Sequence, residues 1–240
     1  MSPRSERRLL DGPVGRLEIA LDWPREGAPA GIAHIAHPHP LYGGSLDNKV
    51  VSTLARAFVS LGWLSVRSNF RGVGASEGVH DEGRGELDDL LHLVDRVANL
   101  LGEAPSSGAG TPAPRPLALA GFSFGSFVAA RAAARLRERG SAARHLVLVG
   151  AAAGKWPMPQ VDPQTLVIHG ELDDTIALTE VFAWARSSEV PVVVIPGADH
   201  FFHRRLTVLK ALLVRHLLGA EAAVHQAADD SAMFPNRPAD

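Results

Sequence analysis

The stretch LALAGFSFGSFVAARAAARLRERG, residues 117–140, places one serine between two glycines. The apolar run before the serine predicts a buried strand, and the alanine-rich run after it predicts a helix. A strand that turns tightly into a helix holds the intervening serine in a strained backbone conformation, with its hydroxyl above the sheet. Gly121 and Gly125 suit this turn because β-carbons there would collide across it. Ser123 is therefore the candidate nucleophile.

Short apolar runs alternate with longer amphipathic runs along the rest of the chain. Most of the short runs are continuously apolar, which is typical of strands buried on both faces of a parallel sheet. The alternation predicts an α/β fold with a doubly wound sheet and helices on both faces. The expected strands are residues 14–23, 31–37, 63–70, 116–121, 145–149, 165–169 and 191–195. The expected helices are residues 48–61, with Asp47 as N-cap, and 86–101, 126–139, 176–186 and 204–218.

The segment 103–116 is rich in glycine, serine and proline, as a linker would be. The strands on either side of it need each other, so it is interpreted as a long surface loop within one domain. That domain is expected over residues 1–219, followed by a disordered tail over residues 220–240.

Composition narrows the classes of partner and chemistry. The 240 residues include 24 basic and 26 acidic side chains, a net charge of −2, so neither nucleic acid nor a membrane is expected as a partner. There is no cysteine, which excludes disulfides, thiolate zinc sites and a cysteine nucleophile. No signal-peptide core and no run long enough to span a bilayer is visible, so a cytoplasmic location is expected.

The pattern Gly-x-Ser-x-Gly occurs a second time, in GASEG at residues 74–78. Ser76 lies there in a polar, glycine-rich loop without a strand before it or a helix after it. Because a nucleophile elbow needs both elements, the context favours Ser123 over Ser76.

A serine hydroxyl needs a histidine to take its proton and an acid to orient that histidine. In the strand–turn–helix arrangement the chain order is serine, acid, histidine, with the last two just beyond later strands. Two segments follow strands in this order, ELDDT at residues 171–175 and ADHFFH at residues 198–203.

Each segment offers two candidates. We expect Asp173 rather than Asp174 to be the acid, and the other aspartate to cap the next helix. We expect His200 rather than His203 to be the base, because His200 lies directly after the strand while His203 falls near the next helix.

An acyl-transfer site also needs backbone N–H donors for an oxyanion. One is expected from Phe124, the residue after the nucleophile, and the other from the loop HPHPLYGGSLDNK at residues 37–49. Proline has no N–H, so His39 is the first choice for the second donor and Leu41 is the second choice.

The histidines of this loop also raise the question of a metal. His37 and His39 form a His-x-His pair, but no further ligand follows at close spacing, so a metal is not expected. His37 is expected to hold the loop by hydrogen bonds. Elsewhere, His169 is expected to pack at a strand end and His80 to be solvated.

Five segments together resemble the α/β-hydrolase superfamily, and in particular the small lidless bacterial serine hydrolases related to dienelactone hydrolase. They are HPHPLYGGSLDNKVV, NFRGVGASEG, GFSFGS, HGELDD and GADHFF, and the resemblance covers residues 30–215. It implies a mostly parallel sheet of about eight strands, a catalytic triad and no cofactor. Carried over, the triad falls on Ser123, Asp173 and His200, with Phe124 and His39 at the oxyanion hole.

The resemblance also bounds the activity. Dienelactone hydrolase uses a cysteine nucleophile, so its chemistry is not expected here. Only residues 150–164 separate two strands where many relatives insert a lid, so the site should be open, with local walls drawn from Tyr42, Trp156, Met158, Phe201 or Phe202. The expectation is a serine esterase for small-molecule carboxylic esters with short or medium acyl chains. The alternatives are a peptidase or amidase with the same triad, and a non-catalytic binding protein on the same fold.

Overall fold

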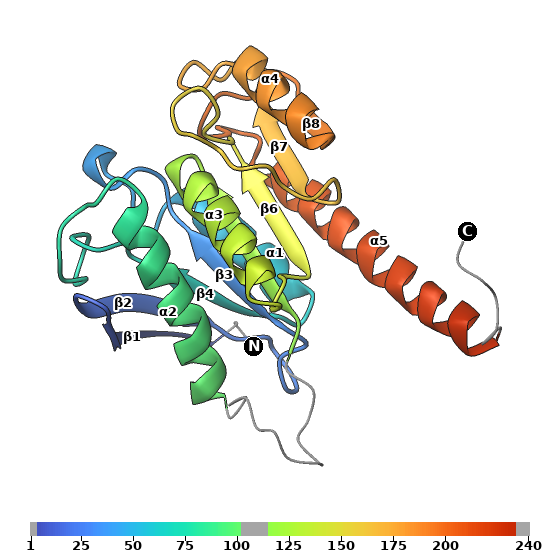
Figure 1. The fold of residues 1–240 in the computed structure, drawn as a ribbon, viewed down its shortest axis with the longest axis horizontal. Coiled ribbons are helices and arrows are strands. Elements are labelled where there is room, and N and C mark those ends of the chain that lie inside the picture. The colour runs from blue at the N-terminus through green and yellow to red at the C-terminus, as the bar shows by residue number, and fades with distance from the viewer. Residues whose placement is uncertain (1–3, 102–114, 234–240) are drawn as a thin grey trace.

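The computed structural model describes residues 4–101 and 115–233, and of residues 224–233 it describes the backbone alone (Figure 1). Eight strands form one sheet in the order β1-β2-β4-β3-β5-β6-β7-β8. The pairs β1–β2 and β2–β4 are antiparallel, and all the other pairs are parallel. The strands are β1 (Ser5–Gly12), β2 (Gly15–Asp22), β3 (Ile32–Ala36), β4 (Leu64–Ser68), β5 (Leu117–Phe122), β6 (His145–Val149), β7 (Leu166–Gly170) and β8 (Val192–Ile195). This confirms the predicted fold class.

Helices cover both faces of the sheet (Figure 1). α1 and α5 pack together on one face, and α2, α3 and α4 cover the other. The central strands are buried on both sides, which explains why their sequences are apolar without alternation. The helices are α1 (Lys49–Ser60), α2 (Arg84–Leu100), α3 (Phe124–Glu138), α4 (Leu178–Ser188) and α5 (Leu206–Met233), with a short 3₁₀ helix, η1 (Pro40–Tyr42).

The hairpin of β1 and β2 adds a strand that the sequence did not predict. β1 is an edge strand in which Leu10 is the one buried residue. Arg7 pairs with Glu18 of β2 and with Asp47 before α1, at 2.8 and 2.6 Å. Charged side chains that face water on an edge strand hide the apolar alternation by which strands are recognised.

The N-cap of α1 is Asn48, so the expectation of Asp47 was wrong. The Asn48 side chain accepts hydrogen bonds from the amides of Val50 and Val51, at 2.9 and 3.4 Å. Asp47 instead accepts hydrogen bonds from Arg7, so its side chain does not turn toward the first amides of α1.

The last helix is longer than expected. α5 continues through Gly219 to Met233, where a disordered tail was expected from residue 220. The alanine-rich sequence after Gly219 favours helix, and Glu221 is paired with Arg144 and His145 at 2.7 and 2.9 Å. Residues 234–240 and most of the loop 103–116 lie outside the described residues. In the described part of the chain, no helix is long and apolar enough to cross a membrane.

Two histidines are buried in or just after the central strand β3. His34 is 1% exposed, and neither of its ring nitrogens has a hydrogen-bond partner among the described residues. Burial lowers its pKa to about 3. Burial likewise lowers the pKa of His37 to about 4, although a hydrogen bond to the Pro38 carbonyl opposes this. Both are therefore neutral in the folded protein at any pH above 5.

We expect His34→Leu to make the protein less sensitive to acid. Below pH ~6.5 the unfolded chain binds a proton at His34 and the folded chain does not, so stability falls as the pH falls, by about 1.4 kcal/mol per pH unit for each such histidine. The variant should therefore gain about 2 kcal/mol over the wild type between pH 7 and pH 5. Urea unfolding at the two pH values measures this. Parallel pH profiles would show that His34 titrates normally in the fold.

Candidate active site

Ser123 lies at a sharp turn between β5 and α3. Its backbone has φ 54° and ψ −123°, a left-handed conformation that a residue with a side chain rarely adopts. A β-carbon on Gly121 would lie 2.1 Å from the Gly125 carbonyl oxygen, and one on Gly125 would lie 2.3 Å from the carbonyl oxygen of Ala36. The predicted reason for both glycines, close approach across the turn, is confirmed.

Gly125→Ala should therefore destabilise the protein by about 3 kcal/mol or more, because the new methyl group meets backbone atoms of β3 that cannot move aside. Gly219→Ala is the matched control. Gly219 lies in α5, where an added β-carbon would have no neighbouring atom within 4 Å outside its own stretch of helix, so alanine should stabilise the protein there by about 0.5–1 kcal/mol. Urea unfolding of the two variants tests the difference, and equal stabilities would contradict a turn of this tightness.

The structure brings Ser123, Asp173 and His200 together, although they come from three separate loops. The Nε2 atom of His200 lies 3.0 Å from Ser123 Oγ, and its Nδ1 atom lies 2.7 Å from Asp173 Oδ2. All three residues are less than 10% exposed. β5, β7 and β8 are parallel, so the loops that follow them meet at one edge of the sheet.

The two carboxylate oxygens of Asp173 have different partners. Oδ1 accepts hydrogen bonds from the amides of Thr175 and Ile176, at 3.0 and 2.7 Å, while Oδ2 faces His200. Burial acts to raise the pKa of Asp173, but the hydrogen bonds from His200 and the Ile176 amide outweigh it and hold the pKa below its usual value. An ionised Asp173 places the proton of His200 on Nδ1 and leaves the lone pair of Nε2 toward Ser123.

The residues expected as alternatives have other contacts. Asp174 is exposed and accepts one 3.4 Å hydrogen bond from the Thr175 hydroxyl, so the expectation that it caps the next helix was wrong. Asp173 both turns the loop and contacts the histidine. His203 is exposed and pairs with Asp199 at 2.6 Å, away from the serine.

His169 packs at a strand end, as expected, but the sequence did not indicate its contact with Asp173. It is fully buried at the end of β7, where its Nε2 atom lies 3.0 Å from the Ile176 carbonyl oxygen and 3.4 Å from Asp173 Oδ2. Burial lowers its pKa, so the ring is neutral and donates from Nε2. Its position four residues before Asp173, at a strand end, is the signal that could have revealed it.

The Ser76 hydroxyl is engaged by two backbone groups. It donates to the Asn69 carbonyl and accepts from the Glu18 amide, both at 2.9 Å, and Ser76 is 7% exposed. These two contacts join β2 to the segment after β4. The serine of the second Gly-x-Ser-x-Gly match thus has a structural role, since it holds its loop to β2.

The loop after β3 is fixed by His37. Its Nδ1 atom donates to the Pro38 carbonyl at 2.6 Å, and its Nε2 atom accepts from the Phe70 amide at 3.0 Å, as the prediction that it holds the loop required. Both nitrogens are therefore engaged with backbone and neither is free to bind a metal. Among the described residues no group of three or more potential metal ligands occurs.

The amide of Leu41 is also engaged, because it donates to Nδ1 of His39 at 3.2 Å. By contrast, within the described chain neither the amide of His39 nor that of Phe124 has an acceptor. Phe124 is the first residue of α3, where the amide has no partner within the helix and the helix dipole is positive. The His39 ring packs on the Phe124 ring, 5.0 Å between centroids, which places the two residues side by side.

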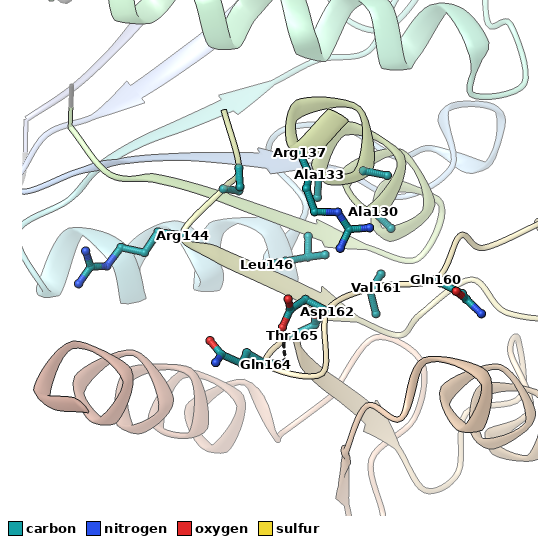
Figure 2. Close-up of a pocket in the computed structure, with 13 residues that line it drawn as sticks. Ala130, Ala133, Arg137, Arg144, Leu146, Gln160, Val161, Asp162, Gln164 and Thr165 are labelled. Atoms are coloured by element: carbon teal, nitrogen blue, oxygen red, sulfur yellow. Dashed lines mark hydrogen bonds between the residues drawn. The ribbon is translucent and has the colours of Figure 1, made fainter. Parts of the chain in front are cut away.

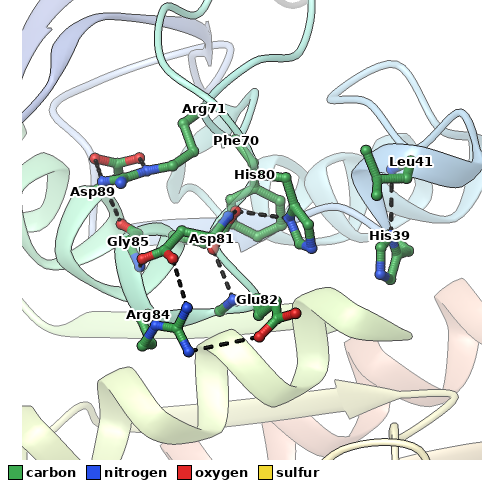
Figure 3. Close-up of polar contacts among 12 residues, drawn as sticks. His39, Leu41, Phe70, Arg71, His80, Asp81, Glu82, Arg84, Gly85 and Asp89 are labelled. Atoms are coloured by element: carbon green, nitrogen blue, oxygen red, sulfur yellow. Dashed lines mark hydrogen bonds and ion pairs between the residues drawn. The ribbon is translucent and has the colours of Figure 1, made fainter.

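A second histidine, His80, lies beside His39. His80 is paired with Glu86 at 2.8 Å and its ring is 4.9 Å from that of His39 (Figure 3). Glu86 is fully buried and also accepts from the amides of Asp81 and Gly83, at 2.9 and 2.8 Å. The expectation that His80 is solvated was wrong, because it rested on the polar sequence around it and missed the partner on α2.

A cavity elsewhere in the molecule is separate from this site. It lies against the second half of α3 and the beginning of β6, with Arg137, Leu146 and Val161 among its lining residues (Figure 2). None of Ser123, Asp173 and His200 lines it. β5 and β6 are neighbouring parallel strands. The cavity lies at their amino ends and the elbow lies at their carboxyl ends, so the cavity does not open onto the serine.

Known hydrolases are similar to this chain in sequence or in fold. The chain is 37% identical to an α/β serine hydrolase without a lid from Xanthomonas campestris, covering 90% of this chain and 95% of that one with a TM-score of 0.77. An α/β serine hydrolase homologue from Coxiella burnetii is also 37% identical, with 88% and 97% covered and a TM-score of 0.76. Dienelactone hydrolase from Anabaena variabilis is 19% identical, with 91% and 99% covered and a TM-score of 0.67, a likeness of fold alone. A family model described as a thioesterase domain matches residues 65–175.

Proposed function

Because this chain belongs to the lidless α/β serine hydrolases, we propose that it cleaves carboxylic esters through an acyl-enzyme on Ser123. The observation that carries the proposal is the continuous chain of hydrogen bonds from Ser123 through His200 to Asp173, at a strained elbow. Such a chain activates a hydroxyl that is otherwise a weak nucleophile.

In the first half of the reaction Ser123 Oγ attacks the ester carbonyl while Nε2 of His200 takes the hydroxyl proton. The tetrahedral intermediate then collapses, the bond to the leaving alcohol breaks, and His200 gives its proton to that alcohol. Asp173 holds the imidazole in the productive tautomer and stabilises its charged form. In the second half, water replaces Ser123 as the nucleophile and releases the acid.

The negative oxygen of the intermediate is assigned to the amides of Phe124 and His39. Their lack of acceptors supports this choice, and the engagement of the Leu41 amide with the His39 ring favours His39 over Leu41. The positive end of the α3 dipole adds to the stabilisation of that oxygen.

Short and medium acyl chains are the proposed substrates. Residues 150–165 connect β6 to β7 without a helix, so no lid covers a long apolar chain. The thioesterase family model supports a second candidate, the hydrolysis of thioesters, which the same acyl-enzyme chemistry would allow.

Labelling with a fluorophosphonate probe tests the proposal. Wild-type protein and the matched control Ser76→Ala should be labelled, and Ser123→Ala should not. Rates on an ester, a thioester and an amide with one shared butyryl group then separate the esterase from the thioesterase and the amidase. A folded wild type that takes no label would overturn the proposal in favour of a binding protein.

A further inference from the structure

The most exposed large apolar side chains of the described structure lie on the loops that carry the candidate site residues. Tyr42, Val79, Leu41 and Leu172 are 87%, 77%, 71% and 64% exposed, more than any other large apolar side chain described. Single exposed apolar residues are ordinary on a protein surface, but a group of them around one opening usually marks a contact surface.

Each of the four is a neighbour of a site residue. The Tyr42 ring is 4.8 Å from the His39 ring, and Val79 directly precedes His80, whose ring is 5.4 Å from that of Phe124. The Tyr42 ring therefore lies beside the loop after β3, and Val79 lies on the loop that carries His80.

The loops after β7 and β8 also carry exposed apolar side chains. Leu172 directly precedes Asp173, and its amide donates to the Ala198 carbonyl at 2.9 Å, which joins the acid loop to the histidine loop. Phe201, 47% exposed, has its ring 5.1 Å from His200. We call these five residues, Leu41, Tyr42, Val79, Leu172 and Phe201, the apolar rim.

The charges beside the apolar rim disfavour an anionic surface. Apart from buried Asp173, the segments 39–45, 79–84, 171–175 and 199–205 carry more acidic than basic side chains. These loops would repel a surface of anionic headgroups or fail to attract it, since binding to such surfaces depends on clustered basic side chains. The chemistry that fits is apolar and uncharged.

We propose that the apolar rim binds the surface of an aggregated, uncharged ester, such as a glyceride droplet, and so presents the ester to Ser123. The inference rests on the proposed function. The apolar rim lies on the loops that carry His39, His80, Asp173 and His200, so a protein partner or a second copy seated on it would cover the site. A substrate surface is the occupant that covers the apolar side chains and still delivers an ester.

The test compares two substrates and two triple variants. Tributyrin droplets present the surface, and dissolved p-nitrophenyl acetate does not. The rim variant is Leu41→Gln/Val79→Gln/Leu172→Gln, and the control variant is Leu9→Gln/Val208→Gln/Leu218→Gln, whose side chains are 44%, 45% and 55% exposed elsewhere. The rim variant should lose about tenfold or more on droplets and less than twofold on the dissolved ester, while the control variant should match the wild type on both.

Binding without turnover is measured by flotation of Ser123→Ala with trioctanoin droplets. This protein should float, and the same protein with the rim substitutions should not. If the wild type hydrolyses the dissolved ester but Ser123→Ala does not float, the rim inference fails and the proposed function stands. If no ester is cleaved in either form, the proposed function fails first and the inference with it. A dimer in sedimentation velocity that the rim substitutions dissociate would also overturn the inference.

Discussion

His200→Gln should lower kcat/KM for p-nitrophenyl butyrate by about 10⁴-fold or more. Glutamine can still bond to Asp173, but it has no basic nitrogen to take the proton of Ser123 Oγ, which lies 3.0 Å from Nε2 of His200. Removal of the general base from a Ser–His–Asp set costs rates of this order in other serine hydrolases. The measurement is steady-state hydrolysis at pH 8 on protein shown to be folded by circular dichroism.

His203→Gln is the matched control for this variant. It lies three residues away, is exposed, and pairs with Asp199 and not with the serine. Its kcat/KM should remain within about twofold of the wild type, as for most surface substitutions. Comparable losses in both variants, or a His200→Gln enzyme with a tenth of the wild-type rate, would remove His200 from the role of base.

Asp173→Asn should reduce kcat by about 10⁴-fold at neutral pH without collapsing the loop. The amides of Thr175 and Ile176 donate to one side of this side chain, so the asparagine oxygen must face them and its NH₂ group must face His200. Nδ1 of His200 then becomes an acceptor and the ring proton moves to Nε2. The lone pair that should take the serine proton is lost.

Asp174→Asn controls for the loss of a charge in the same loop. Asp174 is exposed and bonds only to the Thr175 hydroxyl among the described residues, so kcat should stay within about twofold. A proton resonance of His200 Nδ1–H that is present in the wild type and absent in Asp173→Asn would verify the tautomer directly by NMR. Full activity in Asp173→Asn would contradict this account of the acid.

Prediction from sequence worked best where a local pattern determines the backbone. The run before Ser123, the paired glycines and the helix after them require one kind of turn, because only a hydrogen leaves room at Gly121 and Gly125. The buried strands were recognisable because their apolar runs meet helices on both faces. β1 was missed for the opposite reason, since its exposed charges give an edge strand no apolar period.

The sequence by itself determined the α/β fold and the elbow at Ser123, because both depend on residues near one another in the chain. The order serine, acid, histidine followed from the strand that precedes each loop. Only the tertiary structure decided that Asp173 and not Asp174 contacts His200, that Ser76 holds its loop to β2, and that His169 and His80 belong to the site. These contacts join side chains far apart in sequence: 27 residues separate Asp173 from His200, and 77 separate Ser123 from it. Neighbouring candidates have nearly the same local sequence, so the choice between them depends on which side chain the folded sheet edge turns toward its partner.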